Sequence, residues 1–121
     1  MIQKYYADKV SKVIPLKGKK ILEVGCGNGV TLKYIAQTYI PEKIIGIDPG
    51  LESWYNIREN KESNWEIRNG DAEKMDFDDN SFDVVYSIAT FEHIEDVSKA
   101  LLEIKRVLKP YGKFYTAFSP I

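Results

Sequence analysis

An apolar run that ends in three alternating glycines constrains this chain more than any other feature. Residues 21–29 read Ile-Leu-Glu-Val-Gly-Cys-Gly-Asn-Gly, and an amphipathic pattern follows them. A buried strand that turns through glycines into a helix presents bare backbone and the positive end of a helix dipole to a ligand. Glu23 lies inside the apolar run, where a carboxyl group is costly to bury without a partner. The pattern predicts a ligand site at this turn; a tight connection without a ligand is the alternative.

Length and charge limit the classes of protein to which the chain can belong. With 121 residues it fits one domain, which we expect to comprise an N-terminal helical segment at 1–17 and a core at 18–121. The net charge of −1 supplies no basic field, so we expect neither a nucleic-acid nor a membrane partner. No apolar run approaches the ~20 residues of a membrane span. Because Cys26 is the only cysteine, no internal disulfide can form, and we expect a cytoplasmic location.

Helical and strand patterns alternate along the chain. Apolar residues recur at helical spacing in several segments, most clearly at 95–108, and short apolar runs between these segments predict strands. The predicted helices cover 3–13, 29–39, 51–60 and 95–108, and the predicted strands cover 20–25, 43–48, 66–68, 82–88 and 113–118. Such alternation indicates βαβ units. We therefore expect an α/β, Rossmann-like doubly wound sheet of about five mainly parallel strands with helices on both faces and the ligand at the carboxyl ends of the strands.

Three acidic residues, Glu23, Asp48 and Asp71, fall at or just after predicted strand ends. Asp48 lies about 20 residues beyond the glycine turn, the spacing at which a carboxylate binds ribose hydroxyls in nucleotide-binding βαβ units. Val30 stands where the dinucleotide fingerprint requires a third glycine, and the turn contains no basic residue. The site therefore suits a ligand that is cationic or neutral there rather than a pyrophosphate. The alternatives are a helix cap for Asp48 and a turn role for Asp71.

Five ordered blocks resemble the class I S-adenosylmethionine-dependent methyltransferases, in particular the methyltransferase type 11 subgroup that includes quinone-biosynthesis enzymes. The blocks are Glu23-x-Gly25-x-Gly27-x-Gly29, Gly46-Ile47-Asp48-Pro49, Gly70-Asp71-Ala72-Glu73, Phe82-Asp83-Val84-Val85 with Phe91-Glu92-His93-Ile94, and Arg106-Val107-Leu108-Lys109-Pro110-x-Gly112. They span roughly residues 18–119. The resemblance implies a seven-stranded fold, of which this chain lacks the C-terminal strand pair.

The resemblance also implies S-adenosylmethionine as the cofactor, with S-adenosylhomocysteine as the product, and assigns a role to each matching position. Glu23 would hold the amino group, and the glycine turn would pass under the methionine moiety. Asp48 would bind the ribose hydroxyls, and Asp71 the adenine amine. The implied cofactor-binding residues are Glu23, Gly25, Cys26, Gly27, Gly29, Asp48, Pro49, Asp71, Ala72, Ser87 and Ile88. Tyr5 or Tyr6 would close over the cofactor.

The catalytic residue is not identified by the sequence. His93, the only histidine, is a candidate general base, although a structural histidine is the more common case. Glu92 and His93 match the end of a metal-binding Glu-x-x-Glu-His arrangement found in some relatives. Ala89 replaces its first glutamate, so we expect no metal.

The predicted function is in-line transfer of a methyl group to an unidentified small-molecule acceptor. A non-catalytic or incomplete cofactor-binding domain that needs a partner or a further region is the alternative. A nicotinamide-dependent oxidoreductase is disfavoured by Val30. The last predicted strand, 113–118, leaves an aromatic edge with Phe114, Tyr115 and Phe118, for which we expect a second copy, a partner or further segments as cover.

Overall fold

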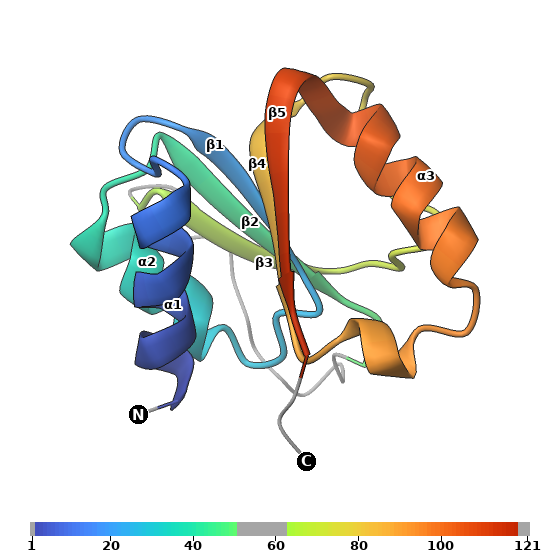
Figure 1. Cartoon of the computed structure of the whole chain (residues 1–121), viewed down its shortest axis with the longest axis horizontal. Helices are drawn as coiled ribbons and strands as arrows, with labels where there is room; N and C mark the ends of the chain where they lie inside the picture. Colours follow the sequence, from blue (N-terminus) through green and yellow to red (C-terminus); the bar gives the residue numbers. More distant parts are fainter. Residues whose placement is uncertain (1, 51–62, 119–121) are drawn as a thin grey trace.

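A computed structural model describes residues 2–50 and 63–118 as an α/β unit with a five-stranded sheet (Figure 1). The strands are β1 (Lys20–Val24), β2 (Lys43–Asp48), β3 (Trp65–Asn69), β4 (Phe82–Ile88) and β5 (Leu108–Ala117). The helices are α1 (Ile2–Val13), α2 (Val30–Thr38), the short 3-10 helix η1 (Phe91–His93) and α3 (Val97–Val107). The helix predicted at 51–60 lies outside the described residues.

All neighbouring strands run parallel, in the order β3-β2-β1-β4-β5. The chain adds β2 and β3 on one side of β1 and then returns to add β4 and β5 on the other side. The strand order therefore reverses between β1 and β4, and in doubly wound sheets a ligand crevice opens at the carboxyl ends of the strands at that point. The predicted doubly wound parallel sheet is confirmed.

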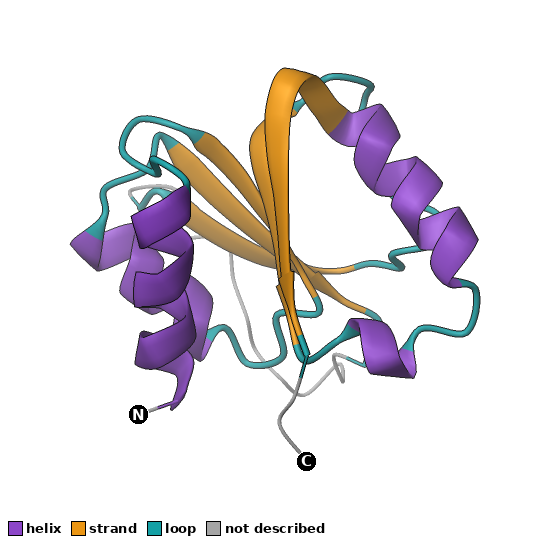
Figure 2. Cartoon of the chain, viewed as in Figure 1, coloured by secondary structure: helices purple, strands orange, loops and turns teal. Residues whose placement is uncertain are grey.

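Helices cover both faces of this sheet, with α1 and α2 on one face and α3 on the other (Figure 2). Successive side chains of β1 point to opposite faces, so Ile21 packs into the core beneath α1 and α2, whereas Leu22 and Val24 pack beneath α3. Both cores are apolar, as expected for a parallel sheet that is buried on both sides. The hydroxyls of Tyr34 and Tyr39 also donate hydrogen bonds to the Asp8 carboxylate and so tie α2 and the residue after it to α1.

The connection from α3 to β5 is shorter than predicted. The helix ends at Val107, and β5 begins at once with Leu108, which pairs with Phe82. The register then shifts, since Val84 pairs with Lys113, and Tyr111 within the shifted part has a positive φ of 68°. Pro110 and its neighbours therefore form an irregular part of a strand rather than the separate loop that the sequence indicated.

The described sheet ends at β3 on one side and at β5 on the other. On the outer side of β5, no strand pairs with it within residues 2–50 and 63–118. The rings of Phe114 and Tyr115 are half-buried against the two core clusters, and Phe118 is exposed. Tyr111, in the irregular part of β5, is 97% exposed. None of the helices in the described ranges is long and apolar enough to cross a membrane.

Candidate functional site

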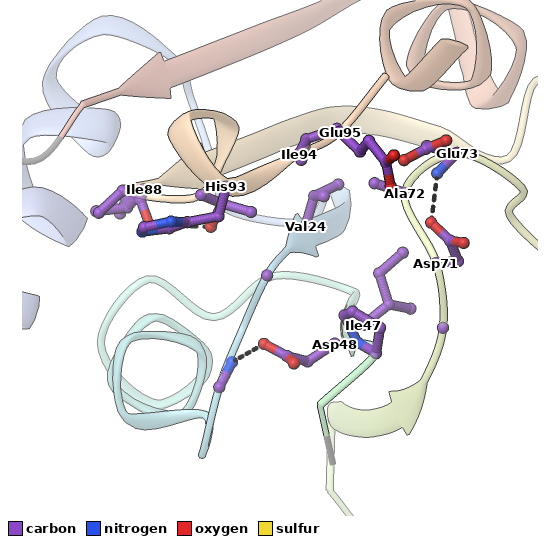
Figure 3. A pocket seen from close by; sticks show the side chains of 16 residues that line it. Val24, Ile47, Asp48, Asp71, Ala72, Glu73, Ile88, His93, Ile94 and Glu95 are labelled. Atoms are coloured by element: carbon purple, nitrogen blue, oxygen red, sulfur yellow. Dashed lines mark hydrogen bonds between the residues drawn. The ribbon is translucent and has the colours of Figure 1, made fainter. Parts of the chain in front are cut away.

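A pocket of about 500 Å³ opens where the strand order reverses, at the carboxyl ends of β1, β2, β3 and β4 (Figure 3). Its walls come from the loops that follow these strands together with η1 and the residues after it. The lining residues are Val24, Gly25, Gly27, Ile47, Asp48, Pro49, Gly70, Asp71, Ala72, Glu73, Ile88, Ala89, Thr90, His93, Ile94 and Glu95. The pocket therefore combines aliphatic walls with several carboxylates.

The glycine turn forms one wall of this pocket, and its conformation explains the residue type. Gly25 and Gly29 have φ values of 79° and 80°, in the left-handed region that side chains disfavour. A Cβ atom on Gly25 would lie 2.2 Å from Oγ1 of Thr90, which belongs to the loop after β4. The Gly25 N–H donates to the Ile47 carbonyl at 2.8 Å. The turn is thus pressed against β2 on one side and the β4 loop on the other.

Asp48 links the two loops that meet at the end of β2. Its Oδ2 accepts a hydrogen bond of 2.9 Å from the Gly27 N–H (Figure 3). Its Oδ1 accepts one of 2.8 Å from the Gly50 N–H. The second bond has the local geometry of a turn, as the alternative interpretation expected. A carboxylate has about four acceptor sites, so both oxygens can also accept from a ligand.

Asp71 lines the pocket from the loop after β3. Its Oδ1 accepts from the Glu73 N–H at 2.8 Å, and its carbonyl accepts from the Lys74 N–H at 3.2 Å. Asp71 is therefore a turn residue and a pocket residue together. Ala72 follows it and is 8% exposed. In Figure 3, Asp48 and Asp71 lie on one side of the pocket, and Ile88 and His93 lie across from them.

Glu23 lies behind the glycine turn, on the sheet face covered by α1 and α2, and is not among the residues that line the pocket. It is 3% exposed, and the Tyr86 hydroxyl donates a hydrogen bond of 2.7 Å to its Oε1. Burial raises the pKa of Glu23 to about 8, and the nearby charge of Asp48 adds to the increase. The carboxyl group is therefore mainly protonated at neutral pH.

Three other residues from the predicted set lie outside the pocket lining. Gly29 is the cap of α2, and Ser87 is fully buried in β4, where its hydroxyl has no hydrogen-bond partner among the described residues. Cys26 is also buried, and burial raises the pKa of its thiol, so the reactive thiolate is disfavoured. Neither Tyr5 nor Tyr6 contributes to the lining.

Sequence reasoning missed several residues that line the pocket. Val24 ends β1, Ile47 is the second-last residue of β2, and Gly70 directly precedes Asp71. The carboxyl ends of parallel strands share one edge of the sheet, so these positions followed from the predicted strands. Glu73 and Ile94 belong to two of the quoted sequence blocks, although no role was assigned to them. Thr90 and Glu95 had no comparable signal, because they come from the irregular residues on either side of η1.

His93 lies in η1 at the pocket, with an exposed side chain. Its backbone N–H donates to the Thr90 carbonyl at 2.9 Å, which fixes the start of the segment. Within the described ranges, no group of three or more histidine, cysteine, aspartate and glutamate residues is arranged to hold a metal ion. The exposure of His93 leaves its imidazole accessible to a molecule in the pocket.

Comparisons with known proteins agree on one family. The family model described as "Methyltransferase domain" matches residues 22–116. An uncharacterised methyltransferase of Schizosaccharomyces pombe is 36% identical over 79% of this chain and 38% of its own length. The fatty-acid O-methyltransferase of Mycolicibacterium smegmatis is 34% identical over 87% of this chain and 39% of its own length. The chain thus spans about two fifths of the length of these curated relatives.

Solved structures agree with this result. A SAM-dependent methyltransferase from Aquifex aeolicus superposes with a TM-score of 0.71 at 29% sequence identity. The match covers 86% of this chain and 58% of that protein. The residues that the family model matches include all of β2, β3 and β4, most of β1 and β5, and every residue that lines the pocket.

Proposed function

The chain belongs to the class I S-adenosylmethionine-dependent methyltransferases, and from this membership we propose that its pocket binds S-adenosylmethionine through the predicted residues. One observation carries the proposal. The Asp48 carboxylate is fixed between the Gly27 and Gly50 N–H groups at the edge of a pocket whose other carboxylates include Asp71. Two fixed carboxylates on aliphatic walls fit a nucleoside with hydroxyl and amino donors.

Asp48 and Pro49 would form the ribose part of the site. A charged carboxylate accepts strong hydrogen bonds from two vicinal hydroxyls, and the two backbone donors already orient it. Asp71 would accept from the adenine amine through the oxygen that the Glu73 N–H does not use. The Ala72 backbone would meet the adenine ring, and Ile88 would lie toward the methyl group. Gly25 and Gly27 would leave backbone open under the methionine moiety, where side chains would fill the space.

Glu23 would act on the amino group from behind the turn, through water, with Cys26, Gly29 and Ser87 supporting the loop from the buried side. Its protonated state in the ligand-free protein has a consequence for binding. A cationic amino group nearby favours the charged form of a carboxyl group, so binding would release a proton from Glu23. The affinity for the cofactor would therefore increase as the pH approaches the pKa of Glu23.

When bound, the cofactor supplies a methyl group on a sulfonium, which an acceptor attacks in line. The chain's own residues orient the two reactants and exclude water, and well-oriented groups contribute roughly 7–11 kcal/mol to such reactions. A proton acceptor is required only if the acceptor molecule loses its proton early. We assign that role to His93, whose exposed side chain lies at the pocket.

We propose a small molecule as the acceptor. The Mycolicibacterium relative is a fatty-acid O-methyltransferase. Carboxylates of Asp71, Glu73 and Glu95 at the pocket disfavour a polyanion such as a nucleic acid. A cytoplasmic location is consistent with this class of acceptor.

The second candidate function is a cofactor-binding unit that needs a partner or a further region for turnover. Two observations favour it: the chain spans about two fifths of the length of its relatives, and the outer edge of β5 is unpaired in the described residues. We propose that a second copy, a partner or further segments cover this edge. Light scattering tests the first possibility, and a monomer that persists at high concentration would contradict it.

Titration calorimetry tests the cofactor assignment directly. The chain should bind S-adenosylmethionine and S-adenosylhomocysteine and should not bind NAD. Absence of binding to both methionine derivatives would overturn the proposal. An assay of methyl transfer to candidate acceptors then distinguishes the two candidate functions. Activity of the chain alone supports the methyltransferase, and binding without activity supports the cofactor-binding unit.

A further inference from the structure

The loop that carries Asp71 and Ala72 is held both by the sheet and by α3. It covers residues 70–81, between β3 and β4. Within the loop, Asp71 and Lys74 form an isolated antiparallel β-bridge. At its start, the Gly70 N–H donates to the Asp48 carbonyl of β2 at 3.3 Å. At its far end, the N–H groups of residues 80 and 81 donate to the carbonyls of residues 106 and 107 at 3.0 and 2.7 Å. Between these two ends, Glu73 accepts from the Asp96 N–H at 3.4 Å, and the course of the chain after the Asp71–Ala72 turn depends on what fixes the middle of the loop.

Arg106 of α3 fixes that middle. Its Nη2 donates to the Met75 carbonyl at 2.9 Å, and its Nη1 donates to the Phe77 carbonyl at 2.7 Å and to Asp79 at 2.9 Å. Glu103, one turn earlier, accepts from Nε of Arg106 at 2.7 Å and from the Met75 N–H at 2.7 Å. Arg106 and Glu103 together thus bind the backbone carbonyl and N–H of Met75, and Arg106 also binds the carbonyl of Phe77.

We propose that Arg106 is a positioning residue that sets the adenine selectivity of the pocket by holding the Asp71–Ala72 turn in place. The inference rests on the proposed cofactor. Only three residues separate Met75 from Asp71, and the turn between them is closed by the Glu73 and Lys74 N–H bonds to Asp71. A displacement of Met75 is therefore carried to the Asp71 carboxylate.

The residue type follows from the geometry. A guanidinium has five donors in a planar fork, so it can reach two carbonyls and two carboxylates at once, whereas a lysine ammonium is a point charge with three donors. The sequence marked this position only as part of the block from Arg106 to Gly112. Nothing in the spacing showed that its side chain reaches the loop of the third strand.

The test compares two ligands that differ at one group. Calorimetry measures the affinity for S-adenosylhomocysteine and for S-inosylhomocysteine, in which a carbonyl oxygen replaces the amine, in the unmodified chain and in Arg106→Gln. The adenine ligand should be preferred by the unmodified chain, and Arg106→Gln should reduce the preference by about tenfold, the equivalent of one well-formed hydrogen bond. Lys105→Gln is the matched control, because it removes the same charge from an exposed position on the same helix, and it should keep the full preference.

The outcomes separate this inference from the proposed function. A preference that is unchanged in Arg106→Gln, even if both affinities fall equally, would overturn the positioning role while leaving the cofactor assignment intact. Failure of the unmodified chain to bind either ligand would overturn the cofactor assignment and, with it, this inference. If Arg106→Gln does not fold, Arg106→Lys retains the charge, and the same ratio of the two affinities is measured in that variant.

Discussion

The Tyr86 hydroxyl donates a hydrogen bond of 2.7 Å to Oε1 of Glu23 within the core between the sheet and the first two helices. The residues are register partners on adjacent parallel strands, so their side chains point to the same face of the sheet. The bond pairs the two side chains where Tyr86 is fully buried and Glu23 is 3% exposed. It also opposes the effect of burial on Glu23, because it favours the charged form of the carboxyl group.

Replacing Tyr86 with phenylalanine should raise the pKa of Glu23 further, since the hydrogen bond that lowers it is lost. The pH at which cofactor affinity rises should move upward with it. The free energy of unfolding should fall by about 1 kcal/mol, the usual net value of one buried hydrogen bond. Calorimetry across a pH series measures the shift. An affinity profile that coincides with that of the unmodified chain would show that Glu23 does not act on the ligand.

The stability of the chain should fall as the pH rises from about 5 to about 8. Glu23 has its pKa raised from 4.5 to about 8 by folding, so over this range the folded state keeps a proton that the unfolded state loses. The stabilisation is complete below the unfolded pKa and is lost as the pH rises through the folded one. Denaturant unfolding at several pH values should show that the free energy of unfolding depends less on pH in Glu23→Gln than in the unmodified chain. Equal slopes for both proteins would contradict the raised pKa.

Asp48→Ala should weaken the binding of S-adenosylhomocysteine by about tenfold or more, because the variant removes the carboxylate that we propose accepts two hydrogen bonds from the ribose. The loss of stability should be small, since the residue is partly exposed. Asp76→Ala, at an exposed position in the loop after β3, is the control for charge. If Asp48→Ala instead unfolds the protein and the folded fraction still binds, the residue serves the turn alone.

Gly25→Ala should destabilise the chain by about 1–3 kcal/mol and abolish cofactor binding. The added methyl group would occupy a strained φ of 79° and also overlap Thr90 at 2.2 Å. Gly18→Ala is a precise control, because Gly18 has a similar φ of 72° but no atom within 4 Å of its Cβ position. The difference in the free energy of unfolding between the two variants isolates the steric contact. An equal loss of stability in both variants would show that the loop containing Thr90 moves to accommodate the added methyl group.

The sequence was sufficient for most of the sheet, because each strand is a short apolar run bounded by a turn, as in 43–48 and 82–88. It also indicated Asp48 and Asp71, since their positions follow from strand ends. The boundary between α3 and β5 was misjudged because a proline and a glycine look like a loop, while the strand pairs on both sides of them. The side of the sheet on which Glu23 lies, and the reach of Arg106, depend on packing between distant segments that local patterns do not contain.

Ala89 shows how the far wall of the pocket obtains its shape. It follows β4 with a positive φ of 56°, which is unfavourable for alanine, and its N–H donates to the Ala117 carbonyl at 2.7 Å. The last residue of β5 thus holds the start of the loop that carries Thr90 and His93. The side of the pocket opposite Asp48 is anchored at the rim of the sheet, and its rigidity depends on how firmly the final strand is held.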